Sequence, residues 1–383
     1  MDYMLSDEEK TLIATAKNIA IEKMKLERKY YDENEEFPWK IIKEFAKSNL
    51  CGVYVPKKYG GLSKGIMGLV LVLEELCKVD SGAALPLAAT ILGTLPIILA
   101  GTEKQKTKYL FDIASGNNLA AFGLTEVNAG SDITGIATTA VKSGDYYIIN
   151  GRKRFITNGG EAQVYTIFAK TNPKKGARGI SCFILEKGMI GFSFGKKEVK
   201  MGIRASSTRE LIFSNCKVHK DNLIGKEGQG LIIAQATLDN SRPGVAAQAL
   251  GIATGALEET VKYAKKRIQF GQTIASFSAI QHMLADMATE IEAARALLYS
   301  LARTIDSGKQ KRVSKESAMA KLFCSEVAMK VTVNAVQIFG GYGYSRECPI
   351  EKMMRDAKIT TIYEGTSQIQ RNEIALNLIK QSF

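Results

Sequence analysis

Apolar side chains recur at helical spacing through the first part of the chain. Leu12, Ala16 and Ile19 fall on one face, and Ser6 with Glu9 three residues later is the capping-box signature of a helix start. The same periodicity predicts further helices at 39–48, 66–78, 88–100 and 103–113. We therefore expect an N-terminal all-α domain over residues 1–118.

From residue 119 the pattern changes to short runs rich in β-branched and aromatic residues. Such runs occupy 146–149, 154–157, 164–169, 180–185 and 210–213. Asn150-Gly151 separates the first two runs and is a strong hairpin cue. Several short strands at regular spacing predict a central β domain, a small barrel or sandwich, over residues 119–228.

Helical periodicity returns in the last part of the chain. It covers 231–267, 279–307, 315–339 and 368–381, with short connections that suit an antiparallel bundle. Pro243 lies inside the first stretch, where it predicts a kink or a helix start. The sequence thus indicates a multi-domain α+β protein whose C-terminal domain, 229–383, is helical. Because pockets favour the places where domains meet, we expect a ligand there.

Composition narrows the class of protein. The chain is 45% hydrophobic and 24% charged, which is typical of a globular protein. Its long apolar run, 83–100, contains two prolines and two threonines, so we interpret it as a core helix and expect no membrane insertion. The acidic start lacks the features of a secretory signal or a transit peptide, and the six cysteines are scattered. These features predict a cytoplasmic protein with reduced thiols.

The chain is basic, with 52 Lys and Arg against 39 Asp and Glu and a net charge of +13. A surface for nucleic acid or for an anionic membrane is one explanation of such a charge. The basic residues are dispersed, however, and a small anionic ligand explains part of the excess equally well. We therefore expect no nucleic-acid partner.

Several common chemistries are missing from the sequence. Gly225, Gly228 and Gly230 do not have the spacing of a Rossmann fingerprint, and the chain has no Walker A motif. His219 and His282 are the only histidines, too few for a histidine-rich metal site, so we expect no metal. Proton transfer is therefore expected to use a carboxylate.

Four segments carry candidate chemistry. Residues 122–132 form a polar, Gly-bearing turn after an apolar run, and 155–160 place an aromatic ring and a hydroxyl at a strand end. Residues 267–271 contain an Arg and a Gln that suit a pyrophosphate. Each of these three also has a plain structural explanation: a loop, a strand end, and a helix C-cap with Gly271 as the stop.

The fourth segment, 362–371, contains Glu364. Ser367 and Gln370 fit a capping box, which would place Glu364 just before a helix N-terminus. A carboxylate at that position is electrostatically favoured and would stay ionised in the free protein, as a general base requires. The plain alternative is one of the many acids that start helices.

In this order and register, the four segments resemble the acyl-CoA dehydrogenase family along nearly the whole chain. Thr125–Asp132 is similar to the first family signature. Arg346–Arg371, which contains Met354–Lys358 and Tyr363–Ser367, is similar to the second. The likeness is greatest to short- and medium-chain enzymes of the butyryl-CoA dehydrogenase type. It implies an N-terminal helical domain, a β domain and a C-terminal four-helix bundle, assembled as a homotetramer (a dimer of dimers) with one FAD per subunit.

The resemblance also implies where FAD would bind. The isoalloxazine ring would contact Phe122, Leu124, Thr125, Ser131, Phe155 and Thr157. The adenine and pyrophosphate end would be completed across the dimer by Arg267, Gln269, Phe270, Gln337 and Gly341. The cofactor would be closed over by Thr366, Ser367 and Gln368.

The implied substrate is a short- or medium-chain acyl-CoA thioester. Its contacts would be Ser131, Asp239, Ser241, Arg242 and Gly365. Glu364 would remove the α-proton, a hydride would pass from the β-carbon to flavin N5, and the product would be a trans-2-enoyl-CoA. Electrons would then pass to an electron-transfer flavoprotein. The alternatives are an enoyl-CoA reductase or an acyl-CoA oxidase of the same fold, and a non-enzymatic DNA-binding family member.

Three positions depart from the family pattern. Val127 stands where Pro is usual, and Ser278 stands where many members have a Gln near the neighbouring subunit's FAD. Ser241 occupies the place of the base in branched-chain and long-chain relatives, which leaves Glu364 as the family-position base. The apolar segment 84–88 is expected to line the acyl pocket and disfavours a carboxylated acyl chain.

Overall fold

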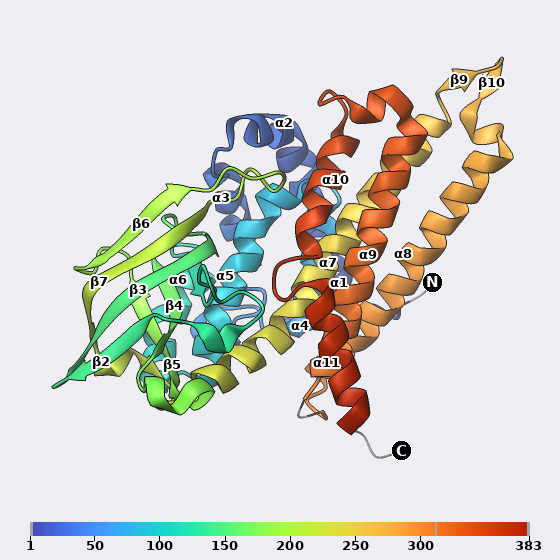
Figure 1. Ribbon diagram of the computed structural model, residues 1–383. Helices are drawn as coiled ribbons and strands as arrows, with labels where there is room; N and C mark the ends of the chain where they lie inside the picture. Colours follow the sequence, from blue (N-terminus) through green and yellow to red (C-terminus); the bar gives the residue numbers. More distant parts are fainter. Residues whose placement is uncertain (1–2, 311, 381–383) are drawn as a thin grey trace.

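The computed structural model describes residues 3–310 and 312–380, and its elements follow the predicted order of helices, strands and helices (Figure 1). In the first part, a π-helical segment at Ala20–Met24 joins α1 to α2. The six helices are α1 (Asp7–Ile19), α2 (Lys25–Asn34), α3 (Trp39–Lys47), α4 (Gly65–Cys77), α5 (Ser81–Ala100) and α6 (Glu103–Ala114). The predicted capping box is confirmed, since Ser6 Oγ accepts from the Glu9 N–H and Glu9 bonds back to the Ser6 N–H.

Helix α5 forms the centre of the N-terminal part. It begins seven residues earlier than the periodicity predicted, because Asp80 caps it by accepting from the N–H groups of Gly82 and Ala83. Its length and composition would suffice to cross a membrane, but 72% of its most apolar window is buried inside the protein, as expected of a core helix. The segment Ser314–Tyr344 is also long and apolar enough to cross a membrane, and 44% of its most apolar window is buried inside the protein.

The central part is one eight-stranded sheet of order β6-β7-β3-β2-β4-β5-β8, with β1 parallel to β4. The strands are β1 (Ala120–Gly123), β2 (Thr139–Ser143), β3 (Tyr146–Thr157), β4 (Val164–Lys170), β5 (Ile180–Glu186), β6 (Phe192–Lys197), β7 (Thr208–His219) and β8 (Leu223–Ile224).

The predicted hairpin at Asn150-Gly151 was wrong. The β2–β3 turn lies at Ser143–Tyr146, and β3 runs on through Gly151 at a register shift against β7. Gly151 has a φ of 144°, and a Cβ there would lie 2.7 Å from the Thr138 Cα. The glycine therefore permits a close approach inside the sheet rather than a turn between two strands.

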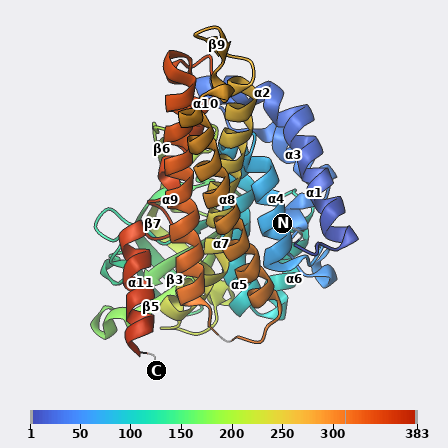
Figure 2. The ribbon, with the colours of Figure 1, turned by 90° about the vertical axis from the view of Figure 1, so that its right-hand side faces the viewer.

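The C-terminal part contains α7 (Gly230–Ala264), α8 (Ser278–Asp306), α9 (Ser314–Phe339), α10 (Pro349–Thr360) and α11 (Ser367–Lys380). Helices α7 to α10 lie side by side, and α11 packs against α9 (Figure 2). Apolar periodicity did not predict α10, because part of its buried face is charged: Lys352 and Asp356 lie in the interior. The predicted end of the last helix, at residue 381, lies outside the described residues.

Pro243 does not start a helix, because α7 begins at Gly230 and continues through it. A proline has no N–H to donate to the carbonyl four residues earlier, here that of Asp239. Ser317 on α9 supplies the missing donor, with its Oγ 2.7 Å from the Asp239 carbonyl oxygen. Helix α7 thus stays continuous, because a side chain of the neighbouring helix donates to the carbonyl that Pro243 leaves without a partner.

The two helical parts pack on each other through α4 and α5 against α7, which places the sheet beside both. Chain segments without regular structure separate α6 from β1 and β8 from α7. We keep 1–118, 119–228 and 229–383 as the proposed domain limits.

Candidate active site

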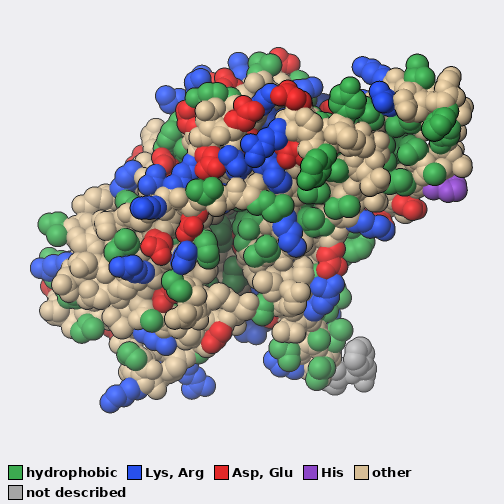
Figure 3. All heavy atoms as spheres, turned by 45° about the horizontal axis from the view of Figure 1, so that its top comes forward, with side chains coloured by type: hydrophobic (Ala, Val, Ile, Leu, Met, Phe, Trp, Pro, Cys, Tyr) green, Lys and Arg blue, Asp and Glu red, His purple; other side chains and the backbone are tan. Residues whose placement is uncertain are grey.

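A cavity of about 820 Å³ lies where the three parts of the molecule meet. Figure 3 shows the surface hollowed between the sheet and the C-terminal helices. Its walls come from α4 and α5, from β1 and β3, and from α7, α11 and the turn before α11. This cavity brings together many of the predicted site residues: Phe122, Leu124, Thr125, Ser131, Phe155, Thr157, Asp239, Ser241, Arg242, Glu364 and Gly365.

Glu364 reaches the cavity from a tight turn between α10 and α11. Glu364 and Gly365 both have left-handed backbone conformations, with φ of 53° and 93°. For a glutamate this conformation costs about 1 kcal/mol, so the surrounding structure must hold it. Gln370 does so by donating from Nε2 to the carbonyl oxygens of Glu364 at 3.0 Å and Gly365 at 2.9 Å.

The capping box predicted for Ser367 and Gln370 was wrong. Helix α11 begins at Ser367, and Thr366 caps it, because Thr366 Oγ1 accepts from the Ile369 N–H at 3.2 Å. Gln370 bonds to backbone carbonyls instead of an N–H, and the buried Ser367 Oγ has no partner among the described residues. Glu364 therefore lies one residue closer to the helix than the capping box implied.

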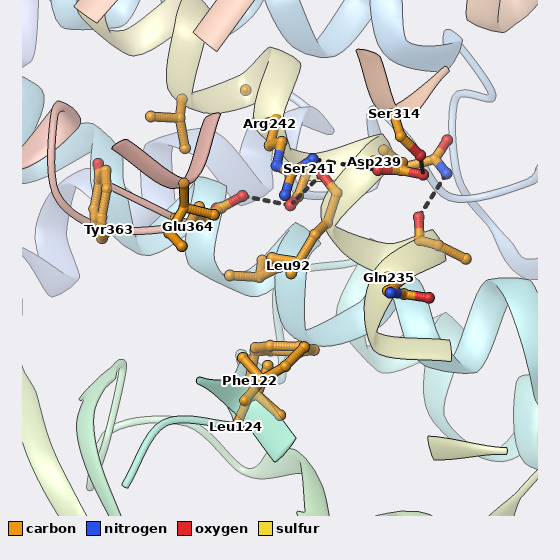
Figure 4. A pocket seen from close by; sticks show the side chains of 18 of the residues that line it. Leu92, Phe122, Leu124, Gln235, Asp239, Ser241, Arg242, Ser314, Tyr363 and Glu364 are labelled. Carbon is orange, nitrogen blue, oxygen red and sulfur yellow. Dashed lines mark hydrogen bonds and ion pairs between the residues drawn. The ribbon is translucent and has the colours of Figure 1, made fainter. Parts of the chain in front are cut away.

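The Glu364 carboxylate lies against α7, where it accepts a hydrogen bond from Ser241 Oγ (Figure 4). Burial raises the pKa of Glu364, while the Ser241 hydrogen bond and the charges of Arg242 and Lys321 act in the opposite direction. That Glu364 is ionised in the free protein stays a prediction. Burial and the two cations act on its pKa in opposite directions.

Asp239, Arg242 and Ser314 form a polar cluster beside Glu364 (Figure 4). One carboxylate oxygen of Asp239 lies 3.4 Å from Arg242 Nη1, and the other accepts from Ser314 Oγ at 2.5 Å. Arg242 is 6% exposed, and its buried Nε has no hydrogen-bond partner in the described part of the chain. An unsatisfied buried donor in a cavity wall is suited to a polar ligand.

The opposite wall is formed by the sheet. Figure 4 shows Phe122 and Leu124 facing the Glu364 side across the cavity. Phe155 lies at the second register shift of β3, has a φ of 58°, and leaves its side chain 58% exposed. A strained backbone that turns an aromatic ring outward into a cavity, next to Thr157, suits a planar aromatic ligand.

A buried ion pair supports this wall from behind. Lys153 Nζ lies 2.6 Å from Glu126 Oε1 and donates to the Leu124 carbonyl at 3.1 Å. Glu126 also accepts from the N–H groups of Ala137 and Thr138. Burial lowers the pKa of Lys153 to about 8. The pair ties the ends of the 124–138 loop together and fixes the segment that carries Thr125 and Ser131.

A second pocket, of about 640 Å³, lies at the far end of the C-terminal helices. Arg267, Gln269 and Gly341 line it, whereas Phe270 projects from the tip of the hairpin formed by β9 (Ile268–Gln269) and β10 (Gln272–Thr273) (Figure 1). Phe270 is 94% exposed. The C-cap interpretation of Gly271 was wrong, because α7 ends at Ala264 and Gly271 forms the hairpin turn.

The predicted residues that line a pocket thus fall into two groups within one chain. Neither pocket is lined by Phe270, Gln337, Thr366, Ser367 or Gln368. Sequence analysis missed Lys321 and Gln248, which are buried against the turn that carries Glu364. One available signal was the position of Lys321 within the row of small residues formed by Ser317, Cys324 and Ala328 on α9.

Comparison with known proteins matches the chain along most of its length. Models of the N-terminal, middle and C-terminal domains of acyl-CoA dehydrogenases match residues 6–117, 121–216 and 228–379. A short-chain-specific acyl-CoA dehydrogenase of Clostridium acetobutylicum is 47% identical over 97% of this chain and 98% of its own. An acryloyl-CoA reductase (NADH) of Anaerotignum propionicum is 46% identical over 100% and 97%.

Two solved structures are similar over their whole length. Butyryl-CoA dehydrogenase from Megasphaera elsdenii has a TM-score of 0.96 and 46% identity, and the match covers 99% of this chain and 100% of that one. A chain from work on the electron transferring flavoprotein of Acidaminococcus fermentans has a TM-score of 0.97 and 50% identity, with 100% of both chains covered.

Proposed function

Because this chain belongs to the acyl-CoA dehydrogenase family, a family of FAD-dependent oxidoreductases, we propose that it converts a short-chain acyl-CoA to a trans-2-enoyl-CoA, with Glu364 as the base. The position of the Glu364 carboxylate carries this proposal: it lies in the wall of the interdomain cavity, across from the aromatic and hydroxyl groups of the sheet. A base facing a flat aromatic-binding wall is the arrangement that α,β-dehydrogenation needs.

The residues present fit FAD. The exposed Phe155 ring, with the hydroxyls of Thr125 and Thr157 beside it, offers a face and hydrogen-bonding groups to a flavin ring. FAD, when bound, accepts the hydride that leaves the β-carbon. We assign the ring contacts to Phe122, Leu124, Thr125, Ser131, Phe155 and Thr157, and the groups that close over the cofactor to Thr366, Ser367 and Gln368.

The second pocket fits the other end of a cofactor held by a neighbouring subunit. We assign this end of the cofactor to Arg267, Gln269 and Gly341, which line the second pocket, and to Phe270 and Gln337. A cation and amide groups suit a pyrophosphate, and an exposed aromatic ring suits an adenine. This arrangement supports an oligomer, proposed as a homotetramer, in which each cofactor contacts two chains.

In the proposed reaction Glu364 takes the α-proton, and negative charge develops on the thioester oxygen. That oxygen needs donors aimed at it. Among the described residues, no group accepts from the Glu364 backbone N–H, so this donor is free to bind the thioester oxygen. Ser241, bonded to the carboxylate, sets the position of the base on the side of α7.

The rest of the substrate is assigned to polar groups along α7 and around the opening. We propose that Ser131, Asp239, Ser241, Arg242 and Gly365 contact it, with the unpartnered Arg242 Nε as an anchor. Arg312 and Lys380 also line the cavity and suit the phosphates of CoA. Electrons are proposed to leave through an electron-transfer flavoprotein, which the likeness to the Acidaminococcus chain supports.

We expect Gln248 to limit the length of the acyl chain. It lines the cavity, is 2% exposed, donates from Nε2 to Ser81 Oγ at 2.6 Å, and accepts from the Tyr363 hydroxyl. This polar bridge crosses an otherwise apolar wall. Gln248→Ala should raise the ratio of kcat/KM for octanoyl-CoA over butyryl-CoA by roughly 10-fold or more, because a deeper pocket can bury the additional methylene groups of the longer acyl chain. Gln235→Ala, in the same cavity, should leave the ratio unchanged.

Phe270 tests the two-subunit cofactor site. Its side chain is 94% exposed, so Phe270→Ala should leave the fold intact yet weaken FAD binding by roughly 10-fold, as removal of an interface anchor does. The measurement is the FAD-to-protein ratio after dialysis, together with the unfolding midpoint. Val199→Ala, at a residue 85% exposed, is the matched control. If the Phe270 variant retained FAD in full, the proposed contact between Phe270 and the cofactor would be rejected.

The proposed function itself is tested by the visible spectrum. We expect the purified protein to be yellow and to bleach on anaerobic addition of butyryl-CoA, and less with octanoyl-CoA. Because one relative at 46% identity is named a reductase, the reverse reaction is tested by adding crotonyl-CoA and NADH. Bleaching by neither acyl-CoA would reject the proposed substrate class. A colourless protein that takes up no FAD and is retained on DNA would support the DNA-binding alternative.

A further inference from the structure

A lysine lies buried beneath the turn that carries Glu364. Lys321 of α9 is 0% exposed, and its Nζ donates to the Gly365 carbonyl oxygen at 2.7 Å. In the described part of the chain no carboxylate lies within 4.0 Å of this ammonium group. Isolated buried lysines are rare, because burial of an unpaired charge is costly. Lys321 therefore needs an explanation beyond packing.

The turn above Lys321 has to be held in an unfavourable shape. Glu364 has a left-handed φ of 53°, and a Cβ on Gly365 would lie 2.7 Å from Gln370 Nε2. The Gly365 carbonyl accepts from both Lys321 and Gln370, and the Glu364 carbonyl accepts from Gln370, so the two peptide planes that follow Glu364 are both held. Lys321 thus helps to set the orientation of the Glu364 side chain and also places a positive charge near its carboxylate.

Two charged groups act on Lys321, one from each side. Glu364 lies on the turn above it and favours the ammonium form, whereas Arg242 on α7 opposes it. Burial is the largest influence and lowers the pKa of Lys321 to about 8. The ammonium form therefore predominates at neutral pH and is lost as the pH rises above 8. In return, its charge lowers the pKa of Glu364 against the raising effect of burial.

We propose that Lys321 is a positioning residue for the dehydrogenation: it holds the Glu364–Gly365 turn by its hydrogen bond and keeps the buried Glu364 carboxylate ionised by its charge. The proposal rests on the proposed function of Glu364 as the base. The hydrogen bond and the charge of Lys321 can be removed by different substitutions. Lys321→Gln keeps an N–H donor without the charge, whereas Lys321→Met removes both.

The two variants give distinct pH profiles for single-turnover bleaching by butyryl-CoA. Without the ammonium charge the pKa of Glu364 rises, so the acid limb of kcat/KM should move up by roughly one pH unit or more in both variants. Above pH 8 Lys321 is itself neutral, so the Gln variant should regain the wild-type rate. The Met variant should stay roughly 10-fold or more below it, because the turn has lost an anchor.

A structural role alone would lower the rate equally at every pH, and that result would overturn the proposal. Lys330→Met is the control, since Lys330 is exposed on the same helix and pairs with Glu290. If Lys321→Met does not fold, Lys321→Gln alone decides the matter: an acid limb unchanged from wild type overturns the electrostatic role. Wild-type protein that no acyl-CoA bleaches would instead reject the proposed function, so the two failures are distinguishable.

Discussion

Glu364→Gln is expected to slow bleaching of the flavin by butyryl-CoA by roughly 10²- to 10⁴-fold, the range that a positioned base contributes. Glutamine has the same shape, and its amide oxygen can still accept from Ser241 Oγ as the carboxylate does. The left-handed turn, held by Gln370, is unaffected. The variant should therefore stay yellow, keep its unfolding midpoint and bind acyl-CoA, yet fail to remove the α-proton.

Stopped-flow absorbance under anaerobic conditions measures this rate directly, and the FAD-to-protein ratio verifies that the cofactor is retained. Glu373→Gln is a matched control, because Glu373 lines the same cavity from α11. It should bleach at nearly the wild-type rate. If the Glu364 variant kept more than a tenth of the rate, the base would have to be sought among the other carboxylates in the cavity, such as Asp239.

The order of the three blocks could be predicted because each has its own periodicity. Leu12, Ala16 and Ile19 repeat at helical spacing and are all buried in α1. The same reasoning failed where the buried side of an element is not apolar. Lys352 and Asp356 occupy the interior side of α10, so their periodicity resembles that of a solvated helix. A dipeptide cue failed similarly, since Gly151 is needed for a close approach rather than a turn.

Local motifs in the sequence pointed to candidate site residues one segment at a time, but they did not indicate which of these residues contact one another. Glu364 stands in a recognisable segment, but its partner Ser241 is 123 residues away, and no spacing rule joins them. Its left-handed backbone arises from anchors on two helices, Lys321 and Gln370, which tertiary packing brings together. The split between two pockets follows from the length of α7: Arg242 on this helix lines the first cavity, whereas the β9–β10 hairpin follows the end of the helix and lies at the second pocket.

The second large effect is expected on stability. Lys352 lies between Asp80 Oδ1 at 2.7 Å and Asp356 Oδ2 at 2.6 Å, and all three side chains are buried. Asp80 also caps α5, and Asp356 also accepts from the Ile203 N–H. The cluster therefore joins all three parts of the molecule. Burial alone would lower the pKa of Lys352, but the charges of Asp356 and Asp80 raise it above its usual value.

Lys352→Met would leave two buried carboxylates facing each other without a cation. Breaking a buried pair in this way costs about 3–5 kcal/mol, so the unfolding midpoint should drop by several degrees. Differential scanning calorimetry measures the change, and Lys29→Met, which breaks the exposed pair with Glu347, should leave the midpoint unchanged.

A second substitution distinguishes two causes of the lost stability: the two carboxylates left without a cation, and the loss of the packing that Lys352 provides. If stranded charge is the cause, Lys352→Met with Asp356→Asn should be more stable than Lys352→Met alone, since one of the two unpaired carboxylates is gone. If lost packing were the cause, the second change should not restore stability, because Asn has nearly the shape of Asp, its amide oxygen can still accept from the Ile203 N–H, and the space left by Lys352 stays unfilled. The direction of the stability change from Lys352→Met to the double variant thus decides whether charge pairing or packing stabilises this contact between the three parts.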